Sequence, residues 1–214
     1  MGTSVLVVGL GRFGTAAALE LMALGHEVLA VDRDPVQVDR IAPQVTHAMQ
    51  LDAGDEASLR SVGAADFAHA VVAMTEARET SIFATMALKS LGVGNVVAKA
   101  GSELHGAILL RVGADRVVYP EREMGLRVAH IFKVPSAVDY LDVGPRFGIV
   151  KTRPPEAFVG RTVGQLDLGR LDLTVVALRR GDRVIVLPQR DQTIAGGDEL
   201  ILLGRDDRLD ELGA

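Results

Sequence analysis

The motif G-x-G-x-x-G directly follows the apolar run 5–8 and comprises Gly9, Gly11 and Gly14. Eighteen residues after the last glycine, a second apolar run ends at Asp32. Between a strand and a helix, the first glycine allows a tight turn, the second lets backbone amides approach a pyrophosphate, and the third lets the helix pack closely on the strand. The phosphates then lie at the positive end of the helix. The sequence therefore predicts a binding site for an adenine nucleotide.

Three further side chains accompany the glycine motif. Asp32 stands where a carboxylate can accept hydrogen bonds from both ribose hydroxyl groups, and its charge would repel a 2′-phosphate. Arg12 lies in the first turn of the predicted helix and can neutralise a phosphate; the alternative is an exposed arginine at a helix start. Phe13 follows in the same turn. We expect all three to line the nucleotide site.

The elements that position these residues alternate between strand and helix up to about residue 132. Short runs rich in valine and alanine predict strands at 4–8, 27–31, 45–51, 70–73, 95–98 and 116–119. Helical patterns predict helices at 11–24, 35–41, 56–62, 77–91, 103–112 and 124–132. Because the strand runs lack strict alternation, they indicate parallel strands covered by helices on both faces. Together these features predict a doubly wound, Rossmann-like sheet.

Residues at the helix ends support this assignment. Asp34 is expected to cap a helix whose first residue is Pro35, and Ser102 is expected to cap the helix at 103–112. Glycines suited to the left-handed position after a helix follow four of the predicted helices, at Gly25, Gly63, Gly92 and Gly113.

After residue 133 the pattern changes to shorter strands that we expect to pair antiparallel. They are predicted at 138–143, 147–152, 174–179, 184–187 and 199–203, with a hairpin turn at 180–182. Short helices are predicted at 163–166 and 206–212. We therefore expect a nucleotide-binding domain over 1–133 and a small α+β domain over 134–214.

Composition excludes several classes of function. The net charge is −5, and no basic block with interleaved aromatic residues is present, which argues against nucleic-acid binding. Cysteine is absent, which excludes disulfides and thiolate chemistry. No apolar run approaches the roughly 18 residues of a membrane span, and Met1 leads almost directly into the first predicted strand. We expect a soluble, cytoplasmic protein.

In a doubly wound sheet the ligand lies outside the carboxyl ends of the strands. Nearly every predicted strand delivers a polar group to this edge. Besides the glycine turn and Asp32, the residues after the strands include Asp52, Ala53, Met74, Thr75, Lys99 and Glu121. Together they predict a polar pocket.

Some of these residues have alternative explanations. Lys99 could be a solvated residue at a strand end, but this edge and the presence of only four lysines favour a phosphate role. Asp52 could bond an adenine or a ribose, or begin the turn before the helix at 56–62. Glu121 would repel phosphates unless a cation or an arginine intervenes. It could hold a divalent cation, pair with Arg12 of a neighbouring subunit, or favour the start of the last helix.

The sequence offers little for catalysis. Among the five histidines, only His105 could reach the pocket, and the alternative is a partly exposed helix residue. No nucleophile–base pair and no histidine cluster with metal-ligand spacing occurs in the sequence. The residues therefore favour a binding protein over an enzyme.

Four segments carry a family resemblance. They are Val-Val-Gly-Leu-Gly-Arg-Phe-Gly at 7–14, Leu-Gly-His-Glu-Val-Leu-Ala-Val-Asp at 24–32, Val-Ala-Lys-Ala at 97–100 and Gly-Ala-Asp-Arg-Val-Val-Tyr-Pro-Glu at 113–121, followed by Met-Gly at 124–125. The chain resembles the cytoplasmic regulatory subunits of Ktr and Trk potassium-uptake systems. The resemblance covers the whole chain, as an RCK domain (regulator of potassium conductance) followed by the small C-terminal domain of that family.

The resemblance implies a regulator of a membrane potassium channel or transporter subunit, located at the inner face of the membrane through that partner. Family members bind ATP, ADP or NAD(H), dimerise through the helix after the sixth strand, and commonly form octameric rings. The positions that contact nucleotide in the family correspond to Arg12, Asp32, Lys99, His105 and Glu121, with Asp52, Ala53, Met74 and Thr75 around the adenosine. The family glutamate matching Glu121 lies near the γ-phosphate at the dimer interface, where Mg²⁺ or Ca²⁺ can bridge subunits.

Some C-terminal domains of the family bind cyclic di-AMP. Here Gly164 stands where a second aliphatic residue is usual. The following segment is one residue shorter, which displaces Arg170 from the usual arginine position. The sequence therefore makes cyclic di-AMP binding doubtful.

Other functions need residues that are harder to find. An NAD-dependent oxidoreductase, the alternative hypothesis, needs a substrate domain and an acid–base residue, for which only His105 is available. A redox sensor that binds DNA needs a helix-turn-helix or a basic patch, and the sequence offers neither. We therefore favour a sensor in which nucleotide exchange changes subunit geometry, with Arg12 and Glu121 distinguishing ATP from ADP.

Overall fold

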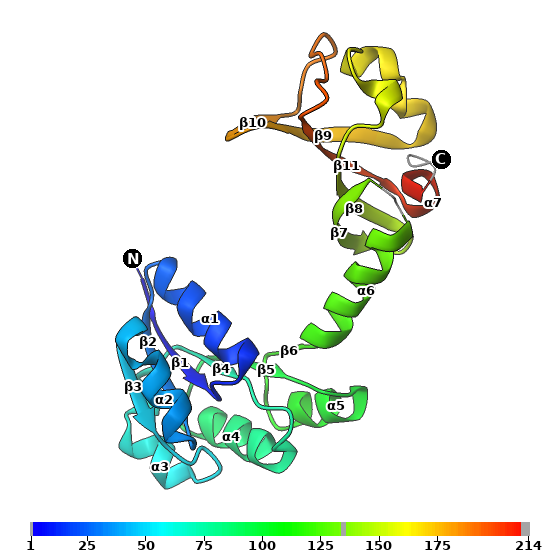
Figure 1. Cartoon of the computed structure of the whole chain (residues 1–214). Coiled ribbons are helices and arrows are strands. Elements are labelled where there is room, and N and C mark those ends of the chain that lie inside the picture. The colour runs from blue at the N-terminus through cyan, green and yellow to red at the C-terminus, as the bar shows by residue number, and fades with distance from the viewer. Residues whose placement is uncertain (1, 134–135, 211–214) are drawn as a thin grey trace. The chain divides into compact units, whose positions relative to one another are not determined.

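The computed structural model describes residues 2–133 and 136–210 (Figure 1). The chain divides into two compact units, Met1–Glu121 and Arg122–Ala214. Val134 and Pro135, where the sequence pattern changes, lie outside the described residues, as do residues 211–212 of the predicted last helix.

Within residues 2–121, six parallel strands form one sheet in the order β3-β2-β1-β4-β5-β6. The strands are β1 Ser4–Val8, β2 Glu27–Asp32, β3 His47–Gln50, β4 His69–Val72, β5 Asn95–Lys99 and β6 Arg116–Val118. The helices are α1 Arg12–Ala23, α2 Pro35–Ile41, α3 Glu56–Ser61, α4 Arg78–Ser90, α5 Glu103–Arg111 and α6 Pro120–Lys133. The strand order reverses at β1 and β4, which is the switch point of a doubly wound sheet. The predicted Rossmann-like fold is confirmed.

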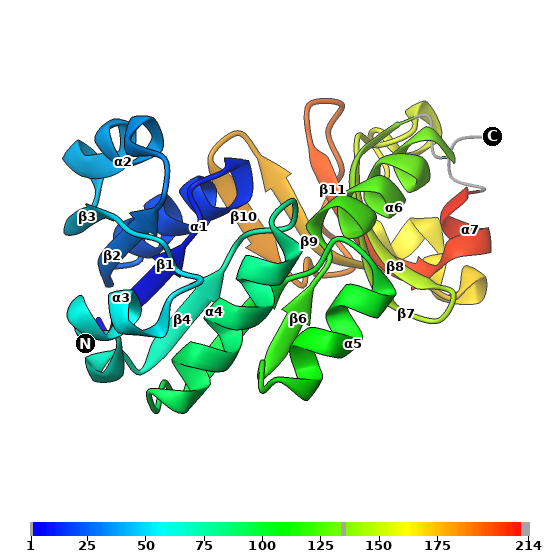
Figure 2. The same ribbon diagram turned by 90° about the horizontal axis from the view of Figure 1, so that it is seen from below.

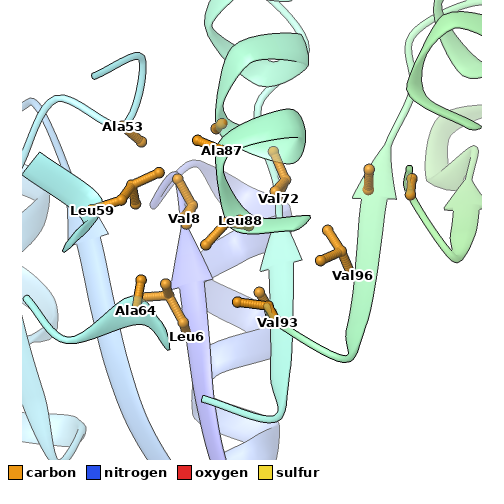
Figure 3. Packing of buried hydrophobic residues seen from close by; sticks show 14 of the residues in the cluster. Leu6, Val8, Ala53, Leu59, Ala64, Val72, Ala87, Leu88, Val93 and Val96 are labelled. Atoms are coloured by element: carbon orange, nitrogen blue, oxygen red, sulfur yellow. The ribbon is translucent and has the colours of Figure 1, made fainter. Parts of the chain in front are cut away.

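Helices cover both faces of this sheet (Figure 2). Leu6 and Val8 of β1 pack toward α3 and α4, whereas Val5 and Val7 pack toward α1 and α2. Figure 3 shows Leu88 of α4 beside Val8 and Val72. Burial on both faces explains why these strands have continuous apolar sequences. The two edge strands differ: β6 has no buried residue, and β3 is mostly exposed and shorter than the predicted 45–51.

The predicted signals at helix ends are confirmed. Asp34 Oδ1 accepts a hydrogen bond from Val36 N at 2.9 Å, with Pro35 in the first turn of α2. Ser102 Oγ accepts a hydrogen bond from His105 N at 3.2 Å at the start of α5. The four glycines predicted to end helices have φ between +73° and +111°. These local interactions set where each strand end meets the next helix.

Within residues 122–133 and 136–210, five strands form an antiparallel sheet in the order β10-β9-β11-β8-β7. The strands are β7 Ala137–Gly144, β8 Phe147–Thr152, β9 Leu173–Arg180, β10 Arg183–Val186 and β11 Glu199–Arg205. Short 3₁₀ helices occur at Glu156–Phe158, Val163–Leu166 and Leu168–Leu171, and α7 Asp206–Asp210 follows β11. The predicted hairpin turn joins β9 to β10. The small α+β fold predicted for this part of the chain is confirmed.

Helix α6 packs against this second sheet near its carboxyl end. The ring of His130 stacks on that of Tyr140 in β7, with 4.0 Å between centroids. Arg127 donates two hydrogen bonds to the Asp139 carboxylate, and Ile131 packs against the core of the second unit. Residues 122–133 therefore group with the second unit in the isolated chain.

The start of α6 differs from its prediction. The helix begins at Pro120, four residues before the predicted start. The prediction followed the apolar residues from Met124 onward, whereas proline is favoured in the first turn of a helix because its missing N–H needs no partner there. The domain boundary at 133/134 stays a prediction, since grouping by compactness does not test how the helix is used in an assembly.

Candidate functional site

Gly9 and Gly14 close the turn between β1 and α1, and neither has space for a side chain. Gly9 has φ +93°, and a Cβ there would lie 2.6 Å from Met74 Cγ. A Cβ at Gly14 would lie 1.8 Å from the Gly9 carbonyl oxygen and 3.0 Å from Ala73 Cβ. The turn and the close approach of α1 to the sheet therefore need these two glycines for the reasons that the motif predicts.

Gly11 differs because the space in front of it is open. A Cβ added there would meet no atom within 4 Å. Gly11 is also the N-cap residue of α1, with φ −67° and ψ −175°, and no side chain caps the helix. The first turn contains no acidic residue. Free amides at the positive end of a helix form an arrangement suited to an anion.

Asp32 holds the glycine turn from the end of β2. Its Oδ2 accepts a hydrogen bond from Leu10 N at 2.5 Å, and its Oδ1 accepts one from Asp34 N at 2.9 Å. The side chain is half-buried. Each carboxylate oxygen keeps a second acceptor position, so bonding to the turn leaves capacity for ribose hydroxyl groups. The sequence did not indicate this anchoring role.

Lys99 and Glu121 form an ion pair across the same edge of the sheet, with 2.6 Å between Lys99 Nζ and Glu121 Oε1. The Lys99 side chain is only 9% exposed, whereas that of Glu121 is 68% exposed. Lys99 Nζ also lies 5.6 Å from the centroid of the Phe13 ring, next to the glycine turn. The hydrogen bond from Lys99 lowers the pKa of Glu121, and the nearby positive charge of Arg12 contributes. The positive charges of Lys99 and Arg12 therefore favour the ionised form of Glu121.

This ion pair is absent from the alternatives that the sequence suggested for Glu121. They were a cation, an arginine of a neighbouring subunit, and the start of the last helix. The structure does place Glu121 in the first turn of α6, but its bonded partner is a lysine of the same chain. A signal was available, because Lys99 ends β5 and Glu121 closely follows β6. These two parallel strands are neighbours, and the two residues carry opposite charges.

His105 is buried, with 3% of its surface exposed. Its Nε2 lies 2.8 Å from Ser81 Oγ, and its Nδ1 accepts a hydrogen bond from Gly101 N at 3.4 Å. Because Ser81 Oγ donates its own proton to the Arg78 carbonyl oxygen, we assign the ring proton to Nε2. Burial lowers the pKa of His105, and the Arg78 charge lowers it further.

These contacts correct one of the two readings of His105. The sequence allowed a partly exposed helix residue, and the structure contradicts this because Ser81 and Gly101 enclose the ring. Its burial depends on Ser81 of α4, so it could not be seen from the sequence of α5 alone. His105 is a neutral link between α4, α5 and the loop at Gly101.

The remaining predicted residues lie at the carboxyl ends of β3 and β4. Asp52 Oδ1 accepts a hydrogen bond from Gly54 N at 2.9 Å, so Asp52 does begin the turn before α3. Ala53 is buried in the core, and Met74 packs against Gly9. Thr75 lines an open cavity of about 660 Å³ with Gly101 and residues 76–80. The structure thus brings Met74 to the glycine turn and Thr75 next to Gly101, whereas Asp52 stabilises its own loop.

The described parts of the chain contain neither a preformed metal cluster nor a helix that could span a membrane. In residues 2–133 and 136–210, no group of three or more His, Asp or Glu side chains is arranged to hold a metal ion. Over the same residues, no helix combines the length and the apolar character that crossing a membrane requires.

Comparison with known sequences gives matches over both units. Residues 5–120 match the TrkA-N domain and residues 149–214 match the TrkA-C domain. The Ktr system potassium uptake protein C of Bacillus subtilis (strain 168) is 36% identical over 199 residues, which cover 92% of this chain and 90% of that protein. The Ktr system potassium uptake protein A of Vibrio alginolyticus is 30% identical over 204 residues, covering 95% and 93%.

Solved structures show the same fold. The crystal structure of the GsuK RCK domain has a TM-score of 0.67 at 17% identity and is matched over 100% of this chain and 48% of that one. The GsuK channel bound to NAD has a TM-score of 0.64 at 16% identity, covering 100% and 40%. The present chain therefore spans about half of the first of these chains and less of the second.

Proposed function

This chain belongs to the TrkA family of potassium uptake proteins, with TrkA-N and TrkA-C domains, and we propose that it is the nucleotide-sensing regulatory subunit of a membrane potassium channel or transporter. An adenine nucleotide, either ATP or ADP or else NAD(H), binds at the glycine turn. Exchange of one nucleotide for another changes the geometry between subunits, and that change controls the membrane partner. In this assembly the chain lies at the cytoplasmic face of the membrane, attached through its partner.

The observation that carries the proposal is the open space in front of Gly11. The amides at the start of α1 have no side-chain cap, and a Cβ at Gly11 would point into unoccupied volume. Lys99 lies beside Phe13 of the same turn, and Arg12 contributes a second positive charge. A pyrophosphate placed there would bond the amides and meet both cations.

Asp32 supports an adenosine whose ribose carries free hydroxyl groups. Its carboxylate is held against the turn by Leu10 N, which fixes it at the end of β2. A 2′-phosphate at this position would meet that negative charge. The proposal therefore selects ATP, ADP or NAD(H) over NADP(H).

Regulation requires that two states of the protein differ in affinity for two ligands, because equal binding shifts no equilibrium. ATP and ADP differ by one phosphate, and we assign the discrimination to Arg12 and Glu121. A homodimer, assembled into an octameric ring, would bring these groups together across subunits. Mg²⁺ or Ca²⁺ at Glu121 would draw its other ligands from phosphates and the partner subunit, since no three-residue metal group occurs within the described chain.

Calorimetric titration of the full chain with ATP, ADP, NAD⁺ and NADP⁺ tests the proposal. We expect ATP, ADP or NAD⁺ to bind and NADP⁺ to bind more weakly. Gly11→Ala should lower nucleotide affinity by about tenfold or more, because its methyl group enters the space for the phosphates. The variant should keep the melting temperature of the parent chain, since its Cβ contacts nothing within 4 Å.

The matched control is Gly14→Ala, whose Cβ would lie 1.8 Å from the Gly9 carbonyl oxygen. That variant should lose thermal stability as well as binding, which separates damage to the fold from damage to the site. A parent chain that binds none of the four nucleotides would refute the proposal, as would a Gly11→Ala variant with unchanged affinity.

The neighbours of His105 favour this function over an NAD-dependent oxidoreductase. Such an enzyme needs a residue that exchanges protons with its substrate. His105 is the candidate that the sequence offers, and its ring nitrogens contact Ser81 and Gly101 instead.

The described part of the second unit offers no support for cyclic di-AMP binding. A Cβ at Gly164 would lie 2.9 Å from the Arg190 carbonyl oxygen, so an aliphatic residue there is sterically disfavoured, and we do not propose cyclic di-AMP binding.

A further inference from the structure

We infer that the Glu121 carboxylate is a built-in competitor for ligand phosphate at Lys99, and that this competition makes Glu121 a specificity-determining residue. A ligand that places a phosphate at Lys99 must displace Glu121, whereas a ligand that lacks such a phosphate leaves the ion pair intact. The inference rests on the proposed function, because it concerns the same nucleotide site.

The Lys99 amine is held in place by burial and by the Phe13 ring. Lys99 closes β5, and nine-tenths of its side chain is buried. Its Nζ lies over the Phe13 ring at 5.6 Å from the centroid, and Phe13 belongs to the first turn of α1. The amine is thus held beside the anion-binding end of that helix. It cannot follow Glu121 into solvent.

Glu121 is the exposed partner of the ion pair. Its side chain is 68% exposed, so water can solvate the carboxylate when it leaves Lys99. The 2.6 Å contact nevertheless gives Lys99 a bonded anion that any phosphate must replace. Because a phosphate accepts charge-assisted hydrogen bonds from an ammonium group as a carboxylate does, exchange is feasible for a phosphate that reaches the amine.

The ion pair also ties helix α6 to the first sheet. Glu121 lies in the first turn of α6, and Lys99 ends β5, so the ion pair joins the start of the helix to the sheet. Displacement by phosphate removes that link. The rest of the helix groups with the second unit through Arg127 and His130. Phosphate bound at Lys99 therefore removes the ion pair that fixes the start of α6.

The test compares ADP and adenosine binding to the full chain by calorimetry in the presence of EDTA, so that no divalent cation bridges Glu121 to phosphate. Glu121→Gln keeps an oxygen that can accept the Lys99 hydrogen bond but removes the charge. We expect ADP to bind about two- to fivefold more tightly, as for loss of a partly exposed ion pair. Adenosine affinity should stay unchanged, because it has no phosphate to compete.

Two further variants complete the design. Glu123→Gln removes the same charge two residues along α6 and should leave the affinity for ADP near that of the parent chain. Lys99→Met should abolish the gain when combined with Glu121→Gln, because the competition has no site without the amine. Circular dichroism melting of every variant checks that the chain is folded.

The outcomes separate the two claims. If the parent chain binds none of ATP, ADP and NAD⁺, the proposed function and this inference fall together. If it binds NAD⁺ but neither ATP nor ADP, only this inference falls. If the parent chain binds ADP but Glu121→Gln leaves that affinity unchanged or weakens it, only the inference is overturned. Equal gains for ADP and adenosine, or an equal gain in Glu123→Gln, would also overturn it, because either result would reflect general charge and not competition at Lys99.

Discussion

His105 shows how neighbours on other elements decide the role of a residue. Its ring links Ser81 of α4 to Gly101 N after β5. The bond that Nδ1 accepts from Gly101 N requires the neutral form, with the proton on Nε2. A second proton on Nδ1 would oppose the Gly101 N–H and would add a charge near Arg78. The residue therefore supports the loops around the cavity at Thr75 without needing to touch a ligand.

A pH-dependent stability follows from this environment. Burial lowers the pKa of His105 from its ordinary 6.5. Below that pH the unfolded chain binds a proton that the folded chain resists, so the contribution of His105 to stability is full above the unfolded pKa and is lost as pH falls toward the folded pKa. We expect urea unfolding between about pH 8 and about pH 5.5 to show this loss, and His105→Gln to reduce it. His47→Gln, at an exposed position, is the control and should retain the loss.

At the same scale, the roles of the glycines were easier to predict from the sequence than the contacts of the charged side chains. The distinct requirements of Gly9, Gly11 and Gly14 follow from backbone geometry, which the motif encodes locally. The bond between Lys99 and Glu121 depends on two strand ends that are 22 residues apart in the sequence. Opposite charges on adjacent strand ends were visible, but side-chain reach was not.

The elements of the second unit depend on a buried carboxylate. Asp198, just before β11, is buried and accepts hydrogen bonds from Arg180 of β9 at 2.7 and 2.8 Å and from Ala195 N at 2.8 Å. The Arg180 hydrogen bond holds the pKa of Asp198 below its ordinary 3.8, so this stabilisation is present above that pH and is lost as pH falls through the folded pKa.

Asp198→Asn should therefore destabilise the chain by about 2 kcal/mol, because it breaks a buried charged pair while leaving Arg180 partly exposed to water. Chemical denaturation measures the difference. The matched control is Asp167→Asn, which removes the carboxylate of an exposed pair with Arg170 and should change stability by less than about 0.5 kcal/mol. Equal effects of the two substitutions would contradict the role assigned to Asp198.

Element positions were largely predictable, since apolar runs and turn residues are local signals. The predicted strands of both sheets all occur within two residues of their observed bounds. Helix α6 was harder, because its packing depends on other elements. Tyr140 lies between the ring of His130 and Gly148, where a Cβ would come within 2.3 Å of the Tyr140 ring. No pattern within α6 indicates that arrangement.

At the scale of the whole molecule, helix α6 begins in the first unit and continues into the second. Glu121 at its start is bonded to Lys99 of the first unit, and His130 near its end stacks on the second. The proposed nucleotide switch acts at the first of these contacts. Ring assembly and the membrane partner could not be predicted from the residues themselves, because they depend on surfaces of other chains; they entered through the family resemblance.

Native mass spectrometry of the purified full-length chain, before and after adding ATP, ADP or NAD⁺, tests the central claim most directly. The account predicts dimers or larger assemblies that carry one adenine nucleotide per chain, either already bound on purification or acquired from the added ligand. A chain that arrives without nucleotide and keeps its bare mass in the presence of all three would contradict the claim that this protein senses nucleotides.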